Sequence, residues 1–104
     1  MFEIRKTVIF AKWIDKLRDI RARARIQARI ERLAIGHAGD VKPVAEGVSE
    51  LRIDYGPGYR VYFTKQGLSL IILLAGGDKR TQTKDIREAL RLARNLQEIN
   101  DENS

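Results

Sequence analysis

The sequence of 104 residues contains no cysteine, one histidine, one tryptophan and two prolines. The absence of cysteine excludes disulfides, thiolate catalysis and metal sites with sulfur ligands. The longest apolar stretch, residues 68–75, is interrupted by a serine and is far shorter than the about 20 residues that cross a bilayer. The first residues also lack the hydrophobic stretch of a signal peptide. We therefore expect a cytoplasmic protein with no membrane partner.

Conventional active sites are missing as well. The single histidine, His37, lies in a glycine-flanked loop, where a histidine is more often an ordinary polar residue than a base or a ligand. Ser49 and Ser69 have no second histidine to serve them, which argues against a serine triad. Acidic residues are scattered rather than clustered as a magnesium or calcium site requires. We expect neither a metal nor a cofactor.

Positive charge is what the sequence does have. Lysine and arginine number 20 against 14 acidic residues, so the formal net charge is +6. The excess lies mainly in residues 1–52, which hold 12 basic and 7 acidic side chains, and within them in a basic cluster over residues 12–32. A basic chain favours a polyanionic partner, whether nucleic acid, an acidic protein or a membrane surface. A solvated basic helix face explains such a cluster equally well.

The periodicity predicts one α+β domain over residues 1–98, followed by a polar tail over 99–104. A short strand at 2–8 precedes a helical hairpin, or one bent helix, over 10–35 with its arginines outward. Asp19 can cap the second helix and Gly36 can end it. The residues of the second helix at core-facing positions are Ala22, Ile26, Ile30 and Leu33.

The period changes to two after residue 48, which predicts an antiparallel meander. Pro43 makes residues 41–46 an edge strand at best. Strands at 48–54 and 59–64 form a hairpin around the turn 55–58. Residues 68–75 are apolar on both faces, as in a covered central strand that ends at Gly76-Gly77. A last helix follows over 82–97.

Arg52 and Arg60 are predicted to share one face of this hairpin with Glu50 and Tyr62. Two arginines facing each other repel unless a carboxylate, from Glu50 or Asp54, pairs with them or an anion binds. Two interpretations therefore stay open: a lattice of arginine and glutamate on a solvated sheet face, or an anion site.

Five segments together resemble a known family. They are residues 10–19, 29–36, 39–44, 50–62 and 74–86, of which ELRIDYGPGYRVYF at 50–63 and GGDK at 76–79 are the most specific. The chain resembles the RelE/ParE superfamily of type II toxins, and more narrowly its HigB-like branch of addiction-module killer proteins. The resemblance implies a RelE-like fold with an N-terminal strand, a helical hairpin, an antiparallel meander and a C-terminal helix.

The resemblance also implies a function. Such a toxin is a ribosome-dependent endoribonuclease that cleaves messenger RNA without a metal, using the 2′-hydroxyl of the RNA as nucleophile. A cognate antitoxin neutralises it in a hetero-oligomer. A ParE-like inhibitor of DNA gyrase, acting by protein binding, is the alternative, and a non-catalytic basic nucleic-acid-binding module is a third. The basic cluster over 12–32 serves either ribosomal RNA contacts or antitoxin docking.

Matching positions give the expected site. Arg60 is expected to stabilise the phosphorane, while Arg52 and Lys79 share phosphate binding and protonation of the leaving group. The base stays open because no histidine or tyrosine follows Tyr62. The candidates for the base are Glu50, Asp78, Asp85 and a lysine. The residues expected to bind RNA are Arg80, Tyr62 (by stacking a base), Lys84, Arg18 and Arg25.

Overall fold

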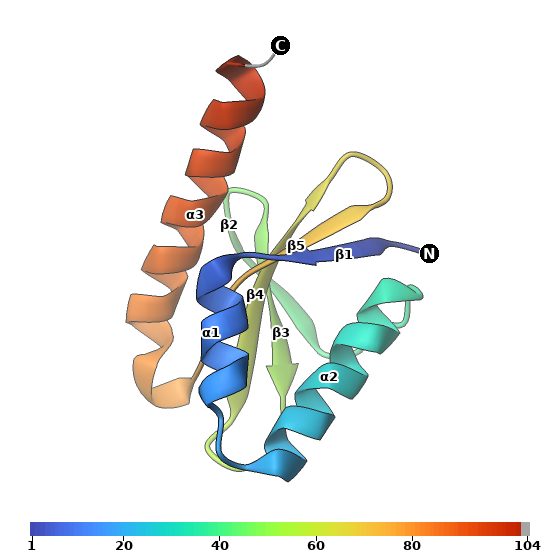
Figure 1. Ribbon diagram of the computed structural model, residues 1–104, viewed down its shortest axis with the longest axis vertical. Coiled ribbons are helices and arrows are strands. Elements are labelled where there is room, and N and C mark those ends of the chain that lie inside the picture. The colour runs from blue at the N-terminus through green and yellow to red at the C-terminus, as the bar shows by residue number, and fades with distance from the viewer. Residues whose placement is uncertain (103–104) are drawn as a thin grey trace.

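A computed structural model shows a five-stranded mixed sheet with helices on both faces (Figure 1). It describes the backbone of residues 1–102 and the side chains of residues 1–96. The sheet order is β1-β5-β4-β3-β2, antiparallel from β2 to β5, with β1 parallel to β5. The elements are β1 (Glu3–Lys6), α1 (Val8–Lys16), α2 (Ile20–Ala34), β2 (Val41–Ala45), β3 (Val48–Ile53), β4 (Tyr59–Gln66), β5 (Leu70–Asp78), the 3-10 turn η1 (Lys79–Thr81) and α3 (Gln82–Glu102).

The predicted α+β class is confirmed, with the antiparallel meander completed by a parallel N-terminal strand. The predicted helical pair is two separate helices. Thr7 caps α1 by accepting a hydrogen bond from the N–H of Phe10, and Asp19 caps α2 as predicted. Gly36, with φ of +90°, ends α2 because glycine adopts this left-handed conformation without steric cost.

The two faces of the sheet have separate cores. The four predicted inward residues of α2 are all buried, and they pack with α1 against β3, β4 and β5. On the opposite face α3 covers a second cluster that contains Val48, Tyr62 and Leu74. Helix α3 lies over the face that carries Glu50 and Arg60 (Figure 1). This face is therefore not solvated, as a lattice of arginine and glutamate on a solvated sheet face would require.

Strand β5 differs from the prediction at both ends. It begins at Leu70, because Leu68 lies in the preceding turn with 98% of its surface exposed. It continues through Gly76 and Gly77 to Asp78 instead of ending at the glycines. A Cβ at Gly76 would collide with the ring of Trp13, and one at Gly77 with the carboxylate of Asp85. The two glycines therefore allow close approach of a helix on each face rather than a turn.

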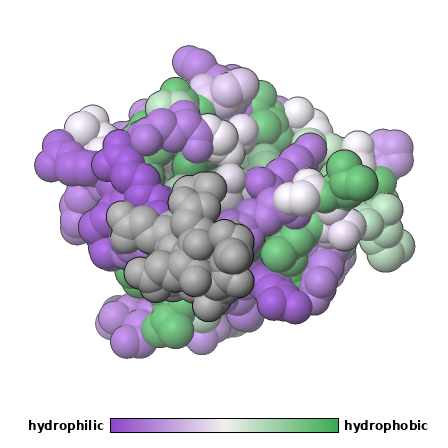
Figure 2. Space-filling model, turned by 90° about the horizontal axis from the view of Figure 1, so that it is seen from above, coloured by the Kyte–Doolittle hydropathy of each residue, from purple (hydrophilic) through white to green (hydrophobic). Residues whose placement is uncertain are grey.

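The last helix is longer than expected, since α3 reaches Glu102 instead of ending at 97. The predicted polar tail at 99–104 falls largely outside the description, which omits the side chains after residue 96 and the backbone of 103–104. Within the described range, none of the helices has the length and hydropathy of a membrane span. On the face of the molecule seen in Figure 2, the hydrophobic residues of the coloured surface form only small groups among hydrophilic ones.

Candidate functional site

Three predicted catalytic cations meet at one end of the sheet. A cavity of about 230 Å³ is lined there by Asp40, Arg52, Asp54, Gly58, Arg60 and Lys79. The strand register explains the meeting, because Arg52 lies opposite Arg60 on β3 and β4, and Arg60 lies opposite Gly77 on β5. Lys79 comes directly after Asp78, the last residue of β5. We call this cavity the cationic pocket.

Arg60 is the unusual member of the cationic pocket because it is a buried charge, 8% exposed. Its Nη1 donates a hydrogen bond to the carbonyl of Tyr59 at 3.2 Å. Its Nε is buried and finds no hydrogen-bond partner among the described residues, and the nearest carboxylate oxygen, Oε1 of Glu50, is 3.9 Å away. Buried polar groups almost always have a partner. The Nε atom is therefore left without a hydrogen bond, while Arg60 itself lines the cationic pocket.

Glu50 does not line the cationic pocket. Its side chain is 3% exposed, and its Oε2 accepts a hydrogen bond from Nε2 of Gln82, at the start of α3, at 3.1 Å. A carboxylate enclosed between α3 and Arg60 cannot reach a substrate in this arrangement. That Glu50 is catalytic stays a prediction, and in this structure its Oε1 lies 3.9 Å from Nε of Arg60 and not among the lining atoms of the cationic pocket. The burial of Glu50 could not be foreseen from a period-two pattern that gives only the face.

Arg52 is paired more fully than expected. Its Nε and Nη2 both donate to Oδ1 of Asp40, at 3.1 and 2.9 Å. The hydrogen bond from Arg52 lowers the pKa of Asp40 below its ordinary value. Asp40 was missed by the sequence analysis, although a signal existed: the hairpin that sets Val41 opposite Leu51 also brings residue 40 beside residue 52.

Lys79 depends on Gly58, which the sequence analysis treated only as a turn residue. The backbone N–H of Lys79 donates to the carbonyl of Gly58 at 3.1 Å. A Cβ at Gly58, which has φ of +82°, would lie 3.1 Å from three carbons of the lysine side chain. The glycine therefore lets the lysine stem lie against the turn at the rim of the pocket.

The residues expected to bind RNA do not join the cationic pocket. Tyr62 is fully buried under α3, so its ring offers no face to a base, and burial raises the pKa of its hydroxyl. The prediction that Tyr62 stacks a base is incompatible with this placement. Arg80 pairs with Asp78 at 2.9 Å, and Arg25 stacks on the ring of Tyr55 at 4.7 Å. Arg18 lies in the loop between α1 and α2, and Lys84 lies on α3.

The carboxylates named as base candidates are also engaged. Hydrogen bonds from Arg80 lower the pKa of Asp78. Asp85 accepts a hydrogen bond from the hydroxyl of Thr81. Asp54 is a different case, because it lines the cationic pocket and forms no ion pair or hydrogen bond with the described residues. Asp54 is therefore the available carboxylate of the site.

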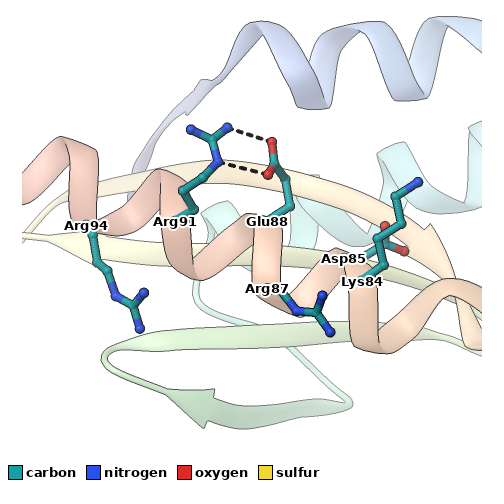
Figure 3. A pocket seen from close by; sticks show the side chains of 6 residues that line it. All are labelled: Lys84, Asp85, Arg87, Glu88, Arg91 and Arg94. Atoms are coloured by element: carbon teal, nitrogen blue, oxygen red, sulfur yellow. Dashed lines mark hydrogen bonds and ion pairs between the residues drawn. The ribbon is translucent and has the colours of Figure 1, made fainter.

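A larger cavity of about 620 Å³ runs along α3 (Figure 3). It is lined by Lys84, Asp85, Arg87, Glu88, Arg91 and Arg94. Arg91 pairs with Glu88 at 2.7 Å, and Arg94 points toward the β2–β3 hairpin, where it pairs with Glu46 at 2.6 Å. All of its lining residues come from one helix, and none is buried. The cationic pocket is the better candidate, because β3, β4 and the segments next to the strands build it and one of its residues is a buried arginine.

Metal ligands do not gather in the part of the chain that is described: it contains no group of three or more histidine, cysteine, aspartate or glutamate side chains able to hold an ion.

Comparison with known proteins decides the family. A model described as "Phage derived protein Gp49-like (DUF891)" matches residues 12–98. The chain belongs to the Gp49-like family. The assignment to the RelE/ParE superfamily and its HigB-like branch was wrong, because the segments on which it rested lie almost entirely within the range that the Gp49-like model matches. An uncharacterized protein of Haemophilus influenzae is 53% identical over 94 residues, which cover 90% of this chain and 95% of that protein.

Proposed function

We propose that this Gp49-like protein is the toxin of a type II toxin-antitoxin system and acts as a metal-independent endoribonuclease on messenger RNA at the ribosome. Membership of a phage-derived family is compatible with a toxin. The observation that carries the proposal is the buried arginine Arg60, whose nearest carboxylate is 3.9 Å away, at a pocket that also holds Arg52 and Lys79. Such a site suits an anion of high charge density, and a phosphodiester supplies one.

We assign the steps of the proposed reaction to the groups that line the pocket. The carboxylate of Asp54 takes the proton of an RNA 2′-hydroxyl, and the 2′-oxygen then attacks the adjacent phosphorus. Arg60 stabilises the extra charge of the phosphorane with donors that are already in place. The bond from phosphorus to the 5′-oxygen breaks, and Lys79 gives that oxygen a proton. The products are a 2′,3′-cyclic phosphate and a 5′-hydroxyl, with no metal in any step.

Arg52 and Glu50 have supporting parts in this proposal. Asp40 already holds two donors of Arg52, so this arginine contributes less charge to the phosphate than Arg60 does. Glu50, held by Gln82, fixes the guanidinium of Arg60 from the side away from the pocket. The exposed basic residues Arg18, Arg25, Arg80 and Lys84 would contact ribosomal or messenger RNA around the site. A cognate antitoxin would neutralise the toxin by binding it directly.

The test is a reconstituted translation reaction with purified protein, ribosomes and a labelled message. We expect cleaved message with cyclic phosphate ends in the presence of EDTA, and no cleavage without ribosomes. Arg60→Ala should lower the cleavage rate about 10²- to 10³-fold. Lys79→Ala, a substitution at an exposed residue, should lower it as well. Arg94→Ala, outside the pocket, is the matched control and should leave the rate unchanged.

Other outcomes distinguish the alternatives. An intact message together with accumulated gyrase–DNA breaks would replace the proposal with gyrase inhibition. Nucleic-acid binding without either event would indicate a non-catalytic basic module. Cleavage that survives in both Arg60→Ala and Lys79→Ala would remove the cationic pocket from the reaction.

A further inference from the structure

Strand β1 has a backbone edge that the rest of the sheet does not use. The N–H of Glu3 donates to Ser69 at 2.7 Å and that of Thr7 to Leu73 at 3.0 Å, so the odd-numbered residues of β1 face β5. In a parallel ladder the residues between them, Ile4 and Lys6, direct their amide groups to the other side. Among the described residues, no backbone hydrogen bond reaches the N–H or C=O of either one on that side.

A groove lies beside this edge, between β1 and α2. Its volume is about 460 Å³, and its lining residues are Ile4, Arg5, Lys6, Phe10, Gln27, Ile30 and Leu73. Phe10, Ile30 and Leu73 are buried core residues that form an apolar floor. Figure 1 shows β1 and α2 on the same side of the molecule, with β1 at the edge of the sheet. We call this feature the β1 groove.

The shape of the β1 groove suits an extended chain. Ile4 and Lys6 offer an alternating set of amide donors and carbonyl acceptors, which is what an added strand pairs with. The four residues of β1 span about 13 Å at the usual rise of a strand. A partner strand with apolar residues on one side could place them on the floor while its backbone pairs with β1. A segment of about five residues is long enough for this.

The positive charge at the rim of the β1 groove favours an acidic partner. Arg5 and Lys6 line the groove and are exposed. The one acidic residue of β1, Glu3, is paired with Arg5 at 3.2 Å. A second copy of β1 would bring the same two cations against this rim, and like charges on paired strands repel. An acidic segment has the complementary charge.

We propose that the β1 groove docks an extended acidic segment of a partner protein, which adds to β1 as a sixth strand of the sheet. The groove shares none of its lining residues with the cationic pocket. The inference therefore stands or falls independently of RNA cleavage. If the protein is a toxin, an antitoxin segment of this chemistry could bind while the cationic pocket remains open.

The probe is a capped eight-residue peptide of alternating glutamate and valine, compared with a peptide in which lysine replaces glutamate. Binding to the full chain is followed by fluorescence anisotropy at several salt concentrations, and amide exchange is measured by NMR. We expect the acidic peptide to bind more weakly as salt rises, and to slow the exchange of the Ile4 and Lys6 amides. The lysine peptide should not bind.

Variants at the edge give the decisive comparison. Ile4→Pro removes an N–H that β5 does not use, and it should raise the Kd about tenfold because one hydrogen bond is lost. Ile4→Val keeps the donor and should bind as the native chain does. Lys6→Glu should also weaken binding. Lys42→Glu places the same charge change on β2, at the opposite edge of the sheet, and should have no effect.

Four results would overturn the proposal. The first is the absence of acidic-peptide binding up to about 1 mM, the affinity of a very weak contact. The second is protection by the peptide of amides that lie elsewhere, and the third is equal binding by Lys6→Glu and the native chain. The fourth is a dimer in sedimentation whose Ile4 and Lys6 amides are protected without peptide, which would assign the edge to a second copy.

Discussion

Beneath α1 and α2 the sheet is packed with apolar side chains, whereas beneath α3 it also holds two buried charges. On the first face the residues that meet the helices include Leu51, Val61 and Phe63. On the second face Glu50 and Arg60 are 3% and 8% exposed, and both Nε of Arg60 and the hydroxyl of Tyr62 lack a hydrogen-bond partner among the described residues. Both faces belong to the same strands, since neighbouring residues alternate between them.

The two faces therefore have different roles: one stabilises the fold by apolar packing, and the other places charged side chains at the cationic pocket. Apolar burial stabilises a protein in proportion to the area removed from water. The attraction between two buried charges 3.9 Å apart offsets little of the free energy that is needed to remove both charges from water. The α3 face therefore gives up stability that a fully apolar face would have. In place of that stability, the α3 face places the positive charge of Arg60 at the cationic pocket.

The largest expected loss of stability comes from a substitution in the core of the apolar face. Ile26 of α2 is completely buried, so Ile26→Ala should lower the free energy of unfolding by about 2–5 kcal/mol through lost burial and a residual cavity. Urea denaturation measures this change. Gln27→Ala, at the exposed neighbouring position, should change it by less than about 0.5 kcal/mol. Anion binding at the cationic pocket should survive in Ile26→Ala, and its loss would show that the two faces are not separate.

A smaller loss of stability is expected from the α3 face, and it should be recoverable. Arg60→Met leaves Glu50 buried without its cation and should cost about 1–3 kcal/mol. Adding Glu50→Gln removes the uncompensated charge and keeps an amide for Gln82, so the double variant should regain most of that loss. Urea denaturation of the two single variants and the double variant gives the free energies of unfolding for this double-mutant cycle.

The matched control for this cycle is Arg80→Met, whose arginine pairs with Asp78 but is 78% exposed at the side chain. An exposed ion pair contributes little, so its stability should stay close to the native value. RNA cleavage should be about 10²- to 10³-fold slower in every variant that lacks Arg60, including the stable double. A double variant as unstable as Arg60→Met would contradict the view that the buried carboxylate is the source of the cost.

The apolar face could be predicted from the sequence because its periodicity is local. Ala22, Ile26, Ile30 and Leu33 repeat at helical spacing, and Asp19 carries its own capping chemistry. The register that sets Arg52 opposite Arg60 also followed, because a hairpin is fixed by its turn.

Long-range features could not be predicted in the same way. The parallel pairing of β1 with β5 joins segments about 67 residues apart, and nothing local specifies it. The prediction that the strand ends at Gly76 and Gly77 is wrong, because the role of these glycines depends on Trp13 and Asp85, which approach only in the folded chain. The family was mistaken for a similar reason. Glycine-rich turns and strand arginines suit many small basic domains, so they do not separate one family from another.

The smallest expected effect concerns the edge of the cationic pocket, where Asp40 holds Arg52. The pKa of Asp40 is lowered in the folded chain, so the pair stabilises the protein above the pKa of the unfolded state and loses this contribution as the pH falls through the folded value. Asp40→Asn should therefore lower the urea midpoint at about pH 6, and the two midpoints should converge by about pH 2. Because the pair is exposed, added salt should shrink the difference at pH 6. Asp15→Asn, an exposed change on α1, should show no such convergence, because Asp15 forms no ion pair with the residues that the structure describes. A difference between Asp40→Asn and the native chain that is the same at both pH values would mean that Asp40 acts through its shape and not its charge, and would remove electrostatic control of Arg52 from the description of the site.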